Sequence, residues 1–402
     1  MRTAWAFLAT ALVALLAGMW IGGHPRNLPD GIRDVFVQSG IAPEVSPSDD
    51  ALSVIESYYF RKTDQARIED ASIRGMVSQL RRQYDDRFSH YFDAEELASF
   101  NEAIEGSFSG VGMTVGQSDE SGIRIGSVFN RSPADRAGLR AGDVIVEVDG
   151  ESILGQNTDL AVAMIKGPEG TEVTLGVRVQ GRGESRRFRL TREEISVPVT
   201  SSRVRKVGGL KLGYVRLTTF SEGASVALGR AVKRVRDKGA VGIVLDLRAN
   251  GGGLLPEAVL TSSLFIPEGD TVVETRSRTQ GNQVYKAVGG DLDPPPMVVL
   301  VNRDTASAAE ILAAALQTSN DDPVVGTRTY GKGVFQQVIG LDNGGALDLT
   351  VGEFLTAEGV SLAGRGLKPD VFSPSRPAAR TDLQLERAFE VLGGEVAAAE
   401  GS

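Results

Sequence analysis

The chain of 402 residues contains no cysteine and only two histidines, His24 and His90. The missing thiols exclude disulfide bonds, thiolate nucleophiles, cysteine-ligated zinc and a lipid anchor on cysteine. Because both histidines lie in the first quarter of the chain, the rest can hold neither an HExxH-type metal site nor a Ser-His-Asp triad. Catalysis in those three quarters has to work without imidazole.

Positively charged residues are outnumbered by negatively charged ones: 43 Lys and Arg stand against 52 Asp and Glu, for a formal net charge of −9. A duplex nucleic-acid binder normally carries a basic face, so we expect no nucleic-acid partner. Hydrophobic residues make up 41% and charged residues 24%, which is ordinary for a globular protein and excludes wholesale disorder. The length predicts two or three domains.

The N-terminus carries one long uncharged run. Residues 4–22 contain no charge and follow Met1 and Arg2, which is the arrangement of an export signal. As a helix they would span about 28 Å, close to the ~30 Å hydrocarbon core of a bilayer. We expect residues 1–23 to be a signal peptide or a membrane anchor. The anchor fits better because the run is long and no small-x-small cleavage site closes it. Both alternatives predict a bacterial envelope protein on the periplasmic or extracytoplasmic side, attached to the inner membrane if the run is retained.

Residues 24–47 contain proline and glycine and predict a linker. From residue 48 to residue 100, apolar side chains recur at spacings of three and four. These positions are Leu52, Ile55, Tyr58, Tyr59, Ile73, Met76, Val77 and Leu80. We expect a helical region whose apolar face forms a small core or a dimer contact. His90, within the aromatic run FSHY, is expected to be structural.

Residues 101–193 change to short alternating segments such as GIRIGSVF and TEVTLGVRV, which predict β-strands. The run SPADRAGLRAGDVI at 132–145, followed by VDG at 148–150, resembles the PDZ domain. In that domain a short helix after SPA precedes AGL, GD and a strand that leads to a DG turn. The resemblance implies a β-sandwich or barrel-like domain that binds the C-termini of proteins or peptides.

The stretch GVGMTVG at 110–116 looks like a dinucleotide-binding fingerprint, but its spacing is wrong and no strand–helix unit surrounds it. In a PDZ domain the equivalent loop offers backbone N–H groups to a tail carboxylate, and the tail then adds as a strand to the sheet edge. The resemblance therefore implies tail binding at Gly110, Val111, Gly112 and Met113.

Residues 194–375 alternate strands and helices, with strands such as AVGIVLDLRA and MVVLVN as continuous apolar runs. Such runs predict an α/β core whose sheet is covered by helices. Residues 376–402 predict a linker and one helix without recognisable chemistry. The whole chain is therefore expected to be a mixed α+β protein.

Two motifs in this core are misleading. GTRTYGK at 326–332 fits the first seven positions of a P-loop, but Gly333 stands where Ser or Thr would bind Mg²⁺, and a strand follows instead of a helix. Asp304-Thr305-Ala306 is half of an aspartic-protease triplet, without the glycine and without a second copy. We expect neither a nucleotide site nor an aspartic protease, and no cofactor or metal.

Ser307 and Lys332 remain as a nucleophile and a base. Ser307 follows a buried strand and begins a helix, where free N–H groups and positive potential are available. Ser307-x-x-Glu310 is also a capping box, which alone could explain this serine. Lys332 stands between two glycines. In an apolar cavity the pKa of such a lysine falls by up to ~3–5 units, and the neutral amine can accept a hydroxyl proton. Without His or Cys, this is the best nucleophile–base pair in the core.

Several motifs, in order, resemble the carboxy-terminal processing proteases, which are tail-specific serine peptidases with a Ser–Lys dyad. They are DLRANGGG at 246–253, SAAEI at 307–311, GKGVFQ at 331–336 and GLKPD at 366–370. The segment DDRFSHYFDAEEL at 85–97, expected to be helical, and the PDZ-like region also lie where that family has them. The resemblance covers about residues 48–375. Ala309 departs from the many members with a second serine there, but that position is not the nucleophile.

The resemblance implies a core of the crotonase/ClpP-like type and a catalytic set. Ser307 would attack the scissile carbonyl, Lys332 would take its proton, and Gln336 would orient either residue through its side-chain amide. The oxyanion would be held by the backbone N–H of Ala308 and by a glycine turn. That turn consists of Gly251, Gly252 and Gly253.

The resemblance also implies that the PDZ domain gates the dyad, with Lys166 coupling the two domains. Expected partners are proteins or peptides with apolar C-termini, an adaptor protein, and further copies of the chain in a homo-oligomer. Two other hypotheses stay open. One is a catalytically silent PDZ scaffold that tethers envelope proteins. The other is an acyl-CoA-handling enzyme, because glycine turns in α/β cores can also hold thioester oxyanions.

Overall fold

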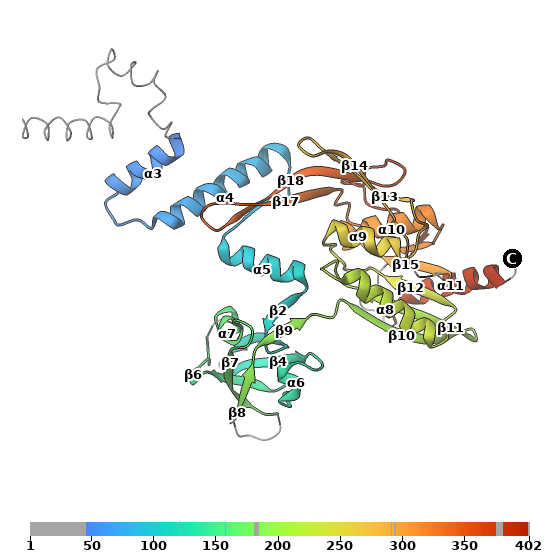
Figure 1. Cartoon of the computed structure of the whole chain (residues 1–402), viewed down its shortest axis with the longest axis horizontal. Coiled ribbons are helices and arrows are strands. Elements are labelled where there is room, and N and C mark those ends of the chain that lie inside the picture. The colour runs from blue at the N-terminus through green and yellow to red at the C-terminus, as the bar shows by residue number, and fades with distance from the viewer. Residues whose placement is uncertain are drawn as a thin grey trace, which may run out of the picture. The chain divides into compact units, whose positions relative to one another are not determined.

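The computed structural model describes residues 46–119, 121–156, 158–180, 185–290, 292, 295–374 and 381–400 (Figure 1). The expected signal peptide or anchor (1–23) and residues 24–45 of the expected linker lie outside these ranges. Within them, no helix combines the length and the apolar character needed to cross a membrane. The chain divides into two compact units, with the boundary between Leu80 and Arg81.

The N-terminal unit contains helix α3 (Pro47–Tyr58) and most of helix α4 (Gln65–Tyr84). Ser46 caps α3, because its side chain accepts a hydrogen bond from the N–H of Asp49 at 3.3 Å. These helices confirm the predicted helical region. Their apolar positions form no buried core: Val77 is buried, whereas Met76 is 60% exposed. The dimer contact stays a prediction.

The segment after α4 is only partly helical. His90–Phe92 form strand β1, which pairs antiparallel with β18 (Ala346–Leu355). Helix resumes at α5 (Ala94–Glu105), which Asp93 begins with a capping box. The expectation of helix throughout DDRFSHYFDAEEL was therefore wrong. The partner of β1 lies far along the chain, and local periodicity carries no information about it.

The region expected to be a PDZ domain has a main sheet in the order β3-β4-β5-β7-β8, with β6 paired to β5. Its elements are β3 (Met113–Asp119), β4 (Gly122–Val128), α6 (Pro133–Arg136), β5 (Val144–Val148), β6 (Glu151–Ser152), α7 (Thr158–Ile165), β7 (Glu172–Arg178) and β8 (Ser185–Thr191). Ile123, Ile145 and Leu175 are fully buried in its own core. Strands β2 (Ser107–Gly110) and β9 (Glu193–Ser196) pair as a separate ribbon where the chain enters and leaves the domain.

The expected α/β core is built on two sheets. The first has the order β10-β11-β12-β15-β16-β19 and is parallel except for β10. The second contains β1, β13, β14, β17 and β18 and is antiparallel. The strands are β10 (Thr200–Val207), β11 (Leu210–Leu217), β12 (Gly242–Asp246), β13 (Thr271–Ser277), β14 (Gly281–Lys286), β15 (Met297–Val301), β16 (Val324–Gly326), β17 (Val334–Gly340) and β19 (Val371–Phe372). The helices are α8 (Ala224–Asp237), α9 (Leu255–Ser263), α10 (Ala308–Ser319) and α11 (Leu383–Glu400).

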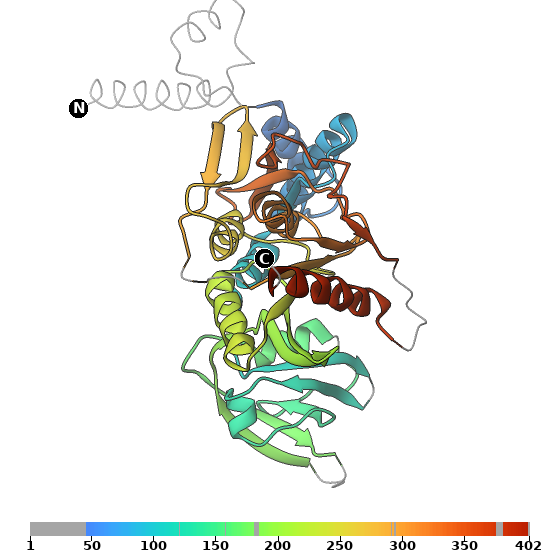
Figure 2. The same ribbon diagram turned by 90° about the vertical axis from the view of Figure 1, so that its right-hand side faces the viewer.

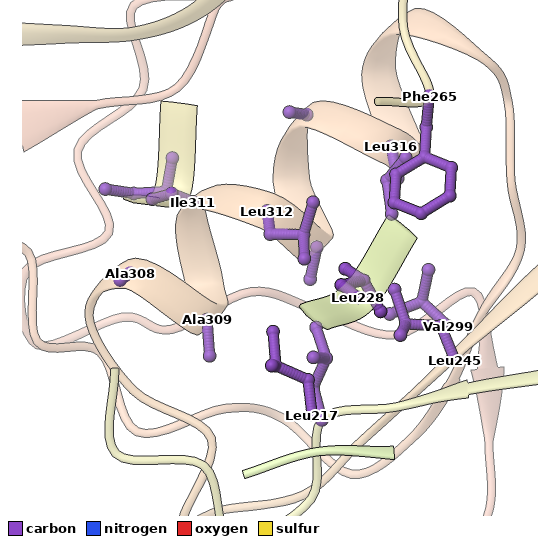
Figure 3. Packing of buried hydrophobic residues seen from close by; sticks show 14 of the residues in the cluster. Leu217, Leu228, Leu245, Phe265, Val299, Ala308, Ala309, Ile311, Leu312 and Leu316 are labelled. Atoms are coloured by element: carbon purple, nitrogen blue, oxygen red, sulfur yellow. The ribbon is translucent and has the colours of Figure 1, made fainter. Parts of the chain in front are cut away.

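Helices cover both faces of the first sheet (Figure 2). Because strand side chains alternate between faces, Leu245 packs with the cluster of α8, α9 and α10, whereas its neighbour Val244 packs with α11. Figure 3 shows Leu312 and Leu316 of α10 directed into the first cluster. The continuous apolar strands are thereby explained, and the predicted α/β core is confirmed. Burial of α10 on this side fixes the helix whose first residue follows Ser307.

Helix α11, to which the sequence assigned no chemistry, is tied to the DLRAN motif. The Arg248 guanidinium donates to Asp246 at 2.8 Å and to Asp382 at 2.7 Å. Asp382 in turn accepts from the N–H of Leu385 at the start of the helix. Tyr214 donates to Asp246 at 2.9 Å, and burial together with this carboxylate raises the pKa of Tyr214 to about 12. These bonds hold the end of β12, from which the glycine turn starts.

Asp322 gives the core a pH-dependent stability. Burial raises the pKa of this carboxyl from 3.8 to about 7 in the folded protein, so the folded state keeps a proton that the unfolded state loses above about pH 4. Stability therefore falls as pH rises from about 4 to about 7. We expect Asp322→Asn, which cannot ionise, to be more stable than the wild type at pH 8 by about 2–4 kcal/mol and equal to it near pH 3.5. Urea unfolding at both pH values measures this, and an equal difference at the two would contradict it.

Candidate active site

Ser307 lies on the turn between β15 and α10, in a backbone conformation that L-residues rarely adopt. Its φ is 57° and its ψ is −123°, which costs about 1–3 kcal/mol unless the surroundings impose it. They do so here. Thr305 donates its hydroxyl to the Leu247 carbonyl at 2.9 Å, and the side-chain oxygen of Asn302 accepts from the N–H of Ala249 at 3.0 Å. The half-buried Ser307 is thus held on a strained turn, as expected for a presented nucleophile.

The capping box predicted as the alternative role for this serine is also present. The Glu310 carboxylate accepts from the backbone N–H of Ser307 at 2.9 Å. The N–H of Glu310 in turn donates to the Ser307 carbonyl at 2.8 Å. Neither of these bonds uses the hydroxyl proton of Ser307, so capping and nucleophilic attack are compatible.

Glu310 does more than cap α10. It is fully buried, and each carboxylate oxygen accepts two hydrogen bonds. One oxygen accepts from the Thr329 hydroxyl at 2.5 Å and from the Gly331 N–H at 2.8 Å. The other accepts from the N–H of Ser307 and from the N–H of Lys332, both at 2.9 Å. A single buried side chain therefore joins the serine turn to the lysine loop.

The glycine turn lies directly against Ser307. A side chain at Gly252 would place its Cβ 2.7 Å from the Ser307 Cβ and 2.9 Å from the Ala308 nitrogen, and φ there is 98°. Only glycine fits this approach. The N–H of Gly252 donates to the Asn250 side chain at 2.9 Å, so it is not free for an oxyanion. Among the described residues, the N–H groups of Ala308, Gly251 and Gly253 have no acceptor. The predicted oxyanion set is thereby narrowed to these three.

Lys332 is held in a tight loop, as its two flanking glycines require. A Cβ at Gly333 would lie 2.2 Å from the Ala363 nitrogen, and one at Gly331 would lie 2.8 Å from the Gly366 nitrogen. Burial lowers the pKa of the half-buried Lys332 amine, while Asp348 opposes this shift. The amine lies 5.1 Å from the centre of the Phe88 ring. Within the described residues it makes no hydrogen bond to Ser307.

Gln336 lies on β17, next to an irregularity in the pairing with β18. Its side-chain amide donates to the Thr350 hydroxyl at 3.4 Å. In the described part of the chain it bonds neither to Lys332 nor to Ser307, so the structure does not bring together all three residues of the expected catalytic set. Its orienting role stays a prediction.

The expected tail-binding loop connects β2 to β3. Gly110 ends β2, Met113 begins β3, and Gly112 has a φ of 77°. The loop carbonyls are occupied: that of Val111 accepts from the Ala134 N–H at 2.9 Å, and that of Gly112 accepts from Phe129 and Ser132. In the described residues, the N–H groups of Val111 and Gly112 have no acceptor. Strand β3 is an edge strand, so N–H groups and a sheet edge are both available to a tail.

Among the described residues, Lys166 has no ion pair or ring contact with the α/β core, although a contact there was expected. Its amine is paired with the Glu102 carboxylate of α5 and lies 5.5 Å from the centre of the Phe108 ring on β2. The expectation placed Lys166 at a face between the PDZ domain and the core, whereas the contacts it makes lie at the connection between α5 and the PDZ domain. Its coupling role stays a prediction.

Sequence reasoning missed two features of this site, the four-fold bonding of Glu310 and the contact between Phe88 and Lys332. The Ser-x-x-Glu spacing signals the first only in part, because it says nothing of the lysine loop. No local signal indicates the second. No group of three or more His, Cys, Asp or Glu residues that could hold a metal ion occurs in the part of the chain that the structure describes.

Known proteins share both parts of this architecture. The model of peptidase family S41 matches residues 211–373, and that of the PDZ domain matches residues 124–179. The carboxy-terminal processing protease CtpA of Bacillus subtilis (strain 168) is 39% identical over 364 residues, which cover 90% of this chain and 75% of the relative. A probable CtpA-like serine protease of Staphylococcus aureus (strain COL) is 37% identical over 320 residues, 79% of this chain and 62% of the relative.

Among solved structures, the photosystem II D1 C-terminal processing protease is 31% identical, with a TM-score of 0.49 over 87% of this chain and 92% of that one. The family assignment rests on sequence, because the similarity to CtpA extends over nearly the whole chain and includes the PDZ domain and the core. This chain belongs to peptidase family S41 and is a C-terminal processing serine protease with a PDZ domain.

Proposed function

We propose that this protein is an endopeptidase of the cell envelope that recognises apolar C-terminal tails through its PDZ domain and cleaves peptide bonds with a Ser307–Lys332 dyad. One observation supports the dyad above all others. The buried carboxylate of Glu310 accepts from the backbone N–H of both Ser307 and Lys332. The backbone positions of nucleophile and base are therefore set relative to each other by one side chain.

The reaction follows from the residues in place. Neutral Lys332 accepts the hydroxyl proton as Ser307 Oγ bonds to the scissile carbonyl carbon. The N–H of Ala308, together with that of Gly251 or Gly253, stabilises the oxyanion. The Lys332 ammonium then gives its proton to the leaving amine as the peptide bond breaks and an acyl-enzyme remains. Water, deprotonated by Lys332, releases the acyl group and restores Ser307.

Recognition of an apolar tail follows from the edge of the PDZ sheet. The free N–H groups of Val111 and Gly112 are donors for a terminal carboxylate. Met113, Val115 and Met164 pack at the margin of the domain core, where apolar tail side chains could extend it. Location in the envelope rests on the uncharged run at residues 4–22. Membership of family S41 replaces the acyl-CoA hypothesis, which depended on the glycine turn alone.

The proposal is tested with the full chain in detergent micelles and one unfolded substrate in two versions, ending in Leu-Ala-Ala or in Asp-Asp-Asp. Burial of an apolar tail worth about 1.4 kcal/mol predicts at least about tenfold higher kcat/KM for the first version. In Gly112→Val this preference should vanish, because the new Cβ would lie 2.2 Å from the Ser132 Cβ. Gly155→Asn is the control, since Gly155 has open space around it and Asn tolerates its positive φ.

Three outcomes separate the alternatives. A preference for the apolar tail that is lost in Gly112→Val and kept in Gly155→Asn supports the proposal. Equal cleavage of both versions by the wild type contradicts tail recognition. Tail binding without any cleavage by the wild type would favour the catalytically silent scaffold.

A further inference from the structure

The turn between α4 and β1, residues 85–89, is anchored to the peptidase core. The Asp86 carboxylate accepts from the N–H of Phe88 at 2.9 Å and from the Thr350 hydroxyl of β18 at 3.1 Å. The fully buried Ser89 hydroxyl donates to Asp86 and accepts from the N–H of Thr350 at 2.9 Å. These bonds close the turn on itself and join it to the strand, so the side chain of Phe88 has a defined position.

That position is against the catalytic base. The Phe88 ring centre lies 5.1 Å from the Lys332 amine, and the ring meets the Tyr330 ring edge-on at 6.5 Å. The face of an aromatic ring attracts an ammonium group and has no such attraction for a neutral amine. Phe88 therefore favours the charged form of Lys332, which cannot accept a proton from Ser307.

The other charged groups around Lys332 do not replace this contact. Asp348, on β18, raises the pKa of Lys332, and burial lowers it. His90 lowers and Asp86 raises the pKa of the Asp348 carboxyl. The Glu310 carboxylate is occupied by backbone N–H groups and the Thr329 hydroxyl. Among the described residues, the Phe88 ring is the group in direct contact with the Lys332 amine.

We propose that Phe88 is a positioning residue that holds Lys332 as an ammonium away from Ser307, so that loss of the proton and departure from the ring occur together when the dyad forms. The proposal rests on the proposed function, because it assigns a role to Phe88 only if Lys332 is the base. The deprotonated amine loses its attraction to the ring and is free to turn toward the serine hydroxyl. The proton leaves to solvent, and no other bond changes.

The expected effect is a shift in the pH profile. In Phe88→Leu an apolar side chain still lies beside the Lys332 amine, but the aromatic ring is lost. The acidic limb of the pH profile of kcat/KM should therefore shift to lower pH by about 0.5–1 unit. Cleavage at a pH below the limb should then rise by about threefold to tenfold, while the high-pH plateau stays within about twofold of wild type. Phe88→Tyr retains the ring and should keep the wild-type limb. Phe92→Leu is the matched control, since Phe92 stacks with Phe100 and, in the part of the chain that the structure describes, Lys332 lies over the Phe88 ring and not over that of Phe92.

If Phe88 only shields Lys332 from water, Phe88→Leu should shift the acidic limb in the opposite direction, to higher pH. In that case the smaller leucine side chain would let water reach the Lys332 ammonium. Hydration would raise the pKa of Lys332, and the acidic limb would shift to higher pH. A limb that moves up or stays in Phe88→Leu overturns the proposal. Phe88→Met, which is also apolar and ringless, gives the same test if the leucine variant does not fold.

A second readout needs no proteolysis. In the full Ser307→Ala chain with ¹³Cε-labelled lysine, the Lys332 resonance, assigned by Lys332→Arg, should titrate at lower pH when Phe88→Leu is added. An unchanged or higher midpoint overturns the role of Phe88 even if cleavage depends on Ser307. A lowered midpoint in a protein whose cleavage does not depend on Ser307 and Lys332 would contradict the proposed function instead.

Discussion

Ser307→Ala and Lys332→Ala are each expected to reduce kcat/KM for peptide-bond cleavage at least about a thousandfold. The chain has no cysteine, so no thiol can take over. Because nucleophile and base act as a unit, the double variant should be no worse than either single variant. The measurement is the initial cleavage rate of an unfolded substrate with an apolar tail.

Lys332→Arg tests whether position 332 needs only a positive charge or a group that can accept a proton. Arginine keeps the positive charge and much of the length but cannot release its proton near neutral pH, so this variant should be as inactive as Lys332→Ala. Lys286→Ala, on the exposed strand β14, should cleave like the wild type. Cleavage by Ser307→Ala above about 1% of wild type, or substantial activity of Lys332→Arg, would show that the dyad is assigned wrongly.

Glu310→Ala is expected to lower both the activity and the stability of the peptidase core. It removes the acceptor of four donors, of which those from Thr329 and Gly331 are buried and those from Ser307 and Lys332 are partly buried. A buried donor left without an acceptor costs about 1–3 kcal/mol. Since the loops relax in part, we expect the free energy of unfolding to fall by about 3–5 kcal/mol. Release of the two loops should lower kcat at least about a hundredfold, as misplacement of reacting groups by about 1 Å does.

Glu310→Gln is the graded version of this test. In either orientation of the amide, one oxygen that accepted two donors becomes an NH₂ group that faces them, so the loss should lie between wild type and Glu310→Ala. Glu358→Ala, at an exposed position of the same core, is the control. Urea unfolding and kcat at a temperature where circular dichroism shows each variant folded measure the two effects. Wild-type kcat in folded Glu310→Ala would contradict the positioning role.

Much of the fold follows from patterns that are local in sequence. The apolar runs around Val244 and Val299 indicate a sheet buried on both sides, and the run from Ser132 to Ile145 indicates a PDZ domain. Both are seen. Strand β1 was not predicted, because three residues stabilised by a distant partner leave no periodicity. The apolar positions of α3 and α4 were predicted correctly as helical, but periodicity does not say what covers them.

Residue chemistry by itself indicated the candidate catalytic pair. The absence of Cys and of His beyond His90 left Ser307 and Lys332 as the candidate nucleophile and base, and glycines at 251–253 marked a turn for close backbone approach. Which N–H groups are free depends on hydrogen bonds that only the folded chain makes. Asn250 takes the N–H of Gly252, so that glycine supplies space and not a donor.

Only the tertiary structure decided how the site is held together. Glu310 and Lys332 are distant in sequence, and so are Phe88 and Lys332, yet each pair is in contact because β18 and α10 bring their loops together. Short-range patterns record the propensity of a segment and the chemistry of its side chains. They do not record which side chain fills the space beside another, because that depends on packing between segments joined by the fold.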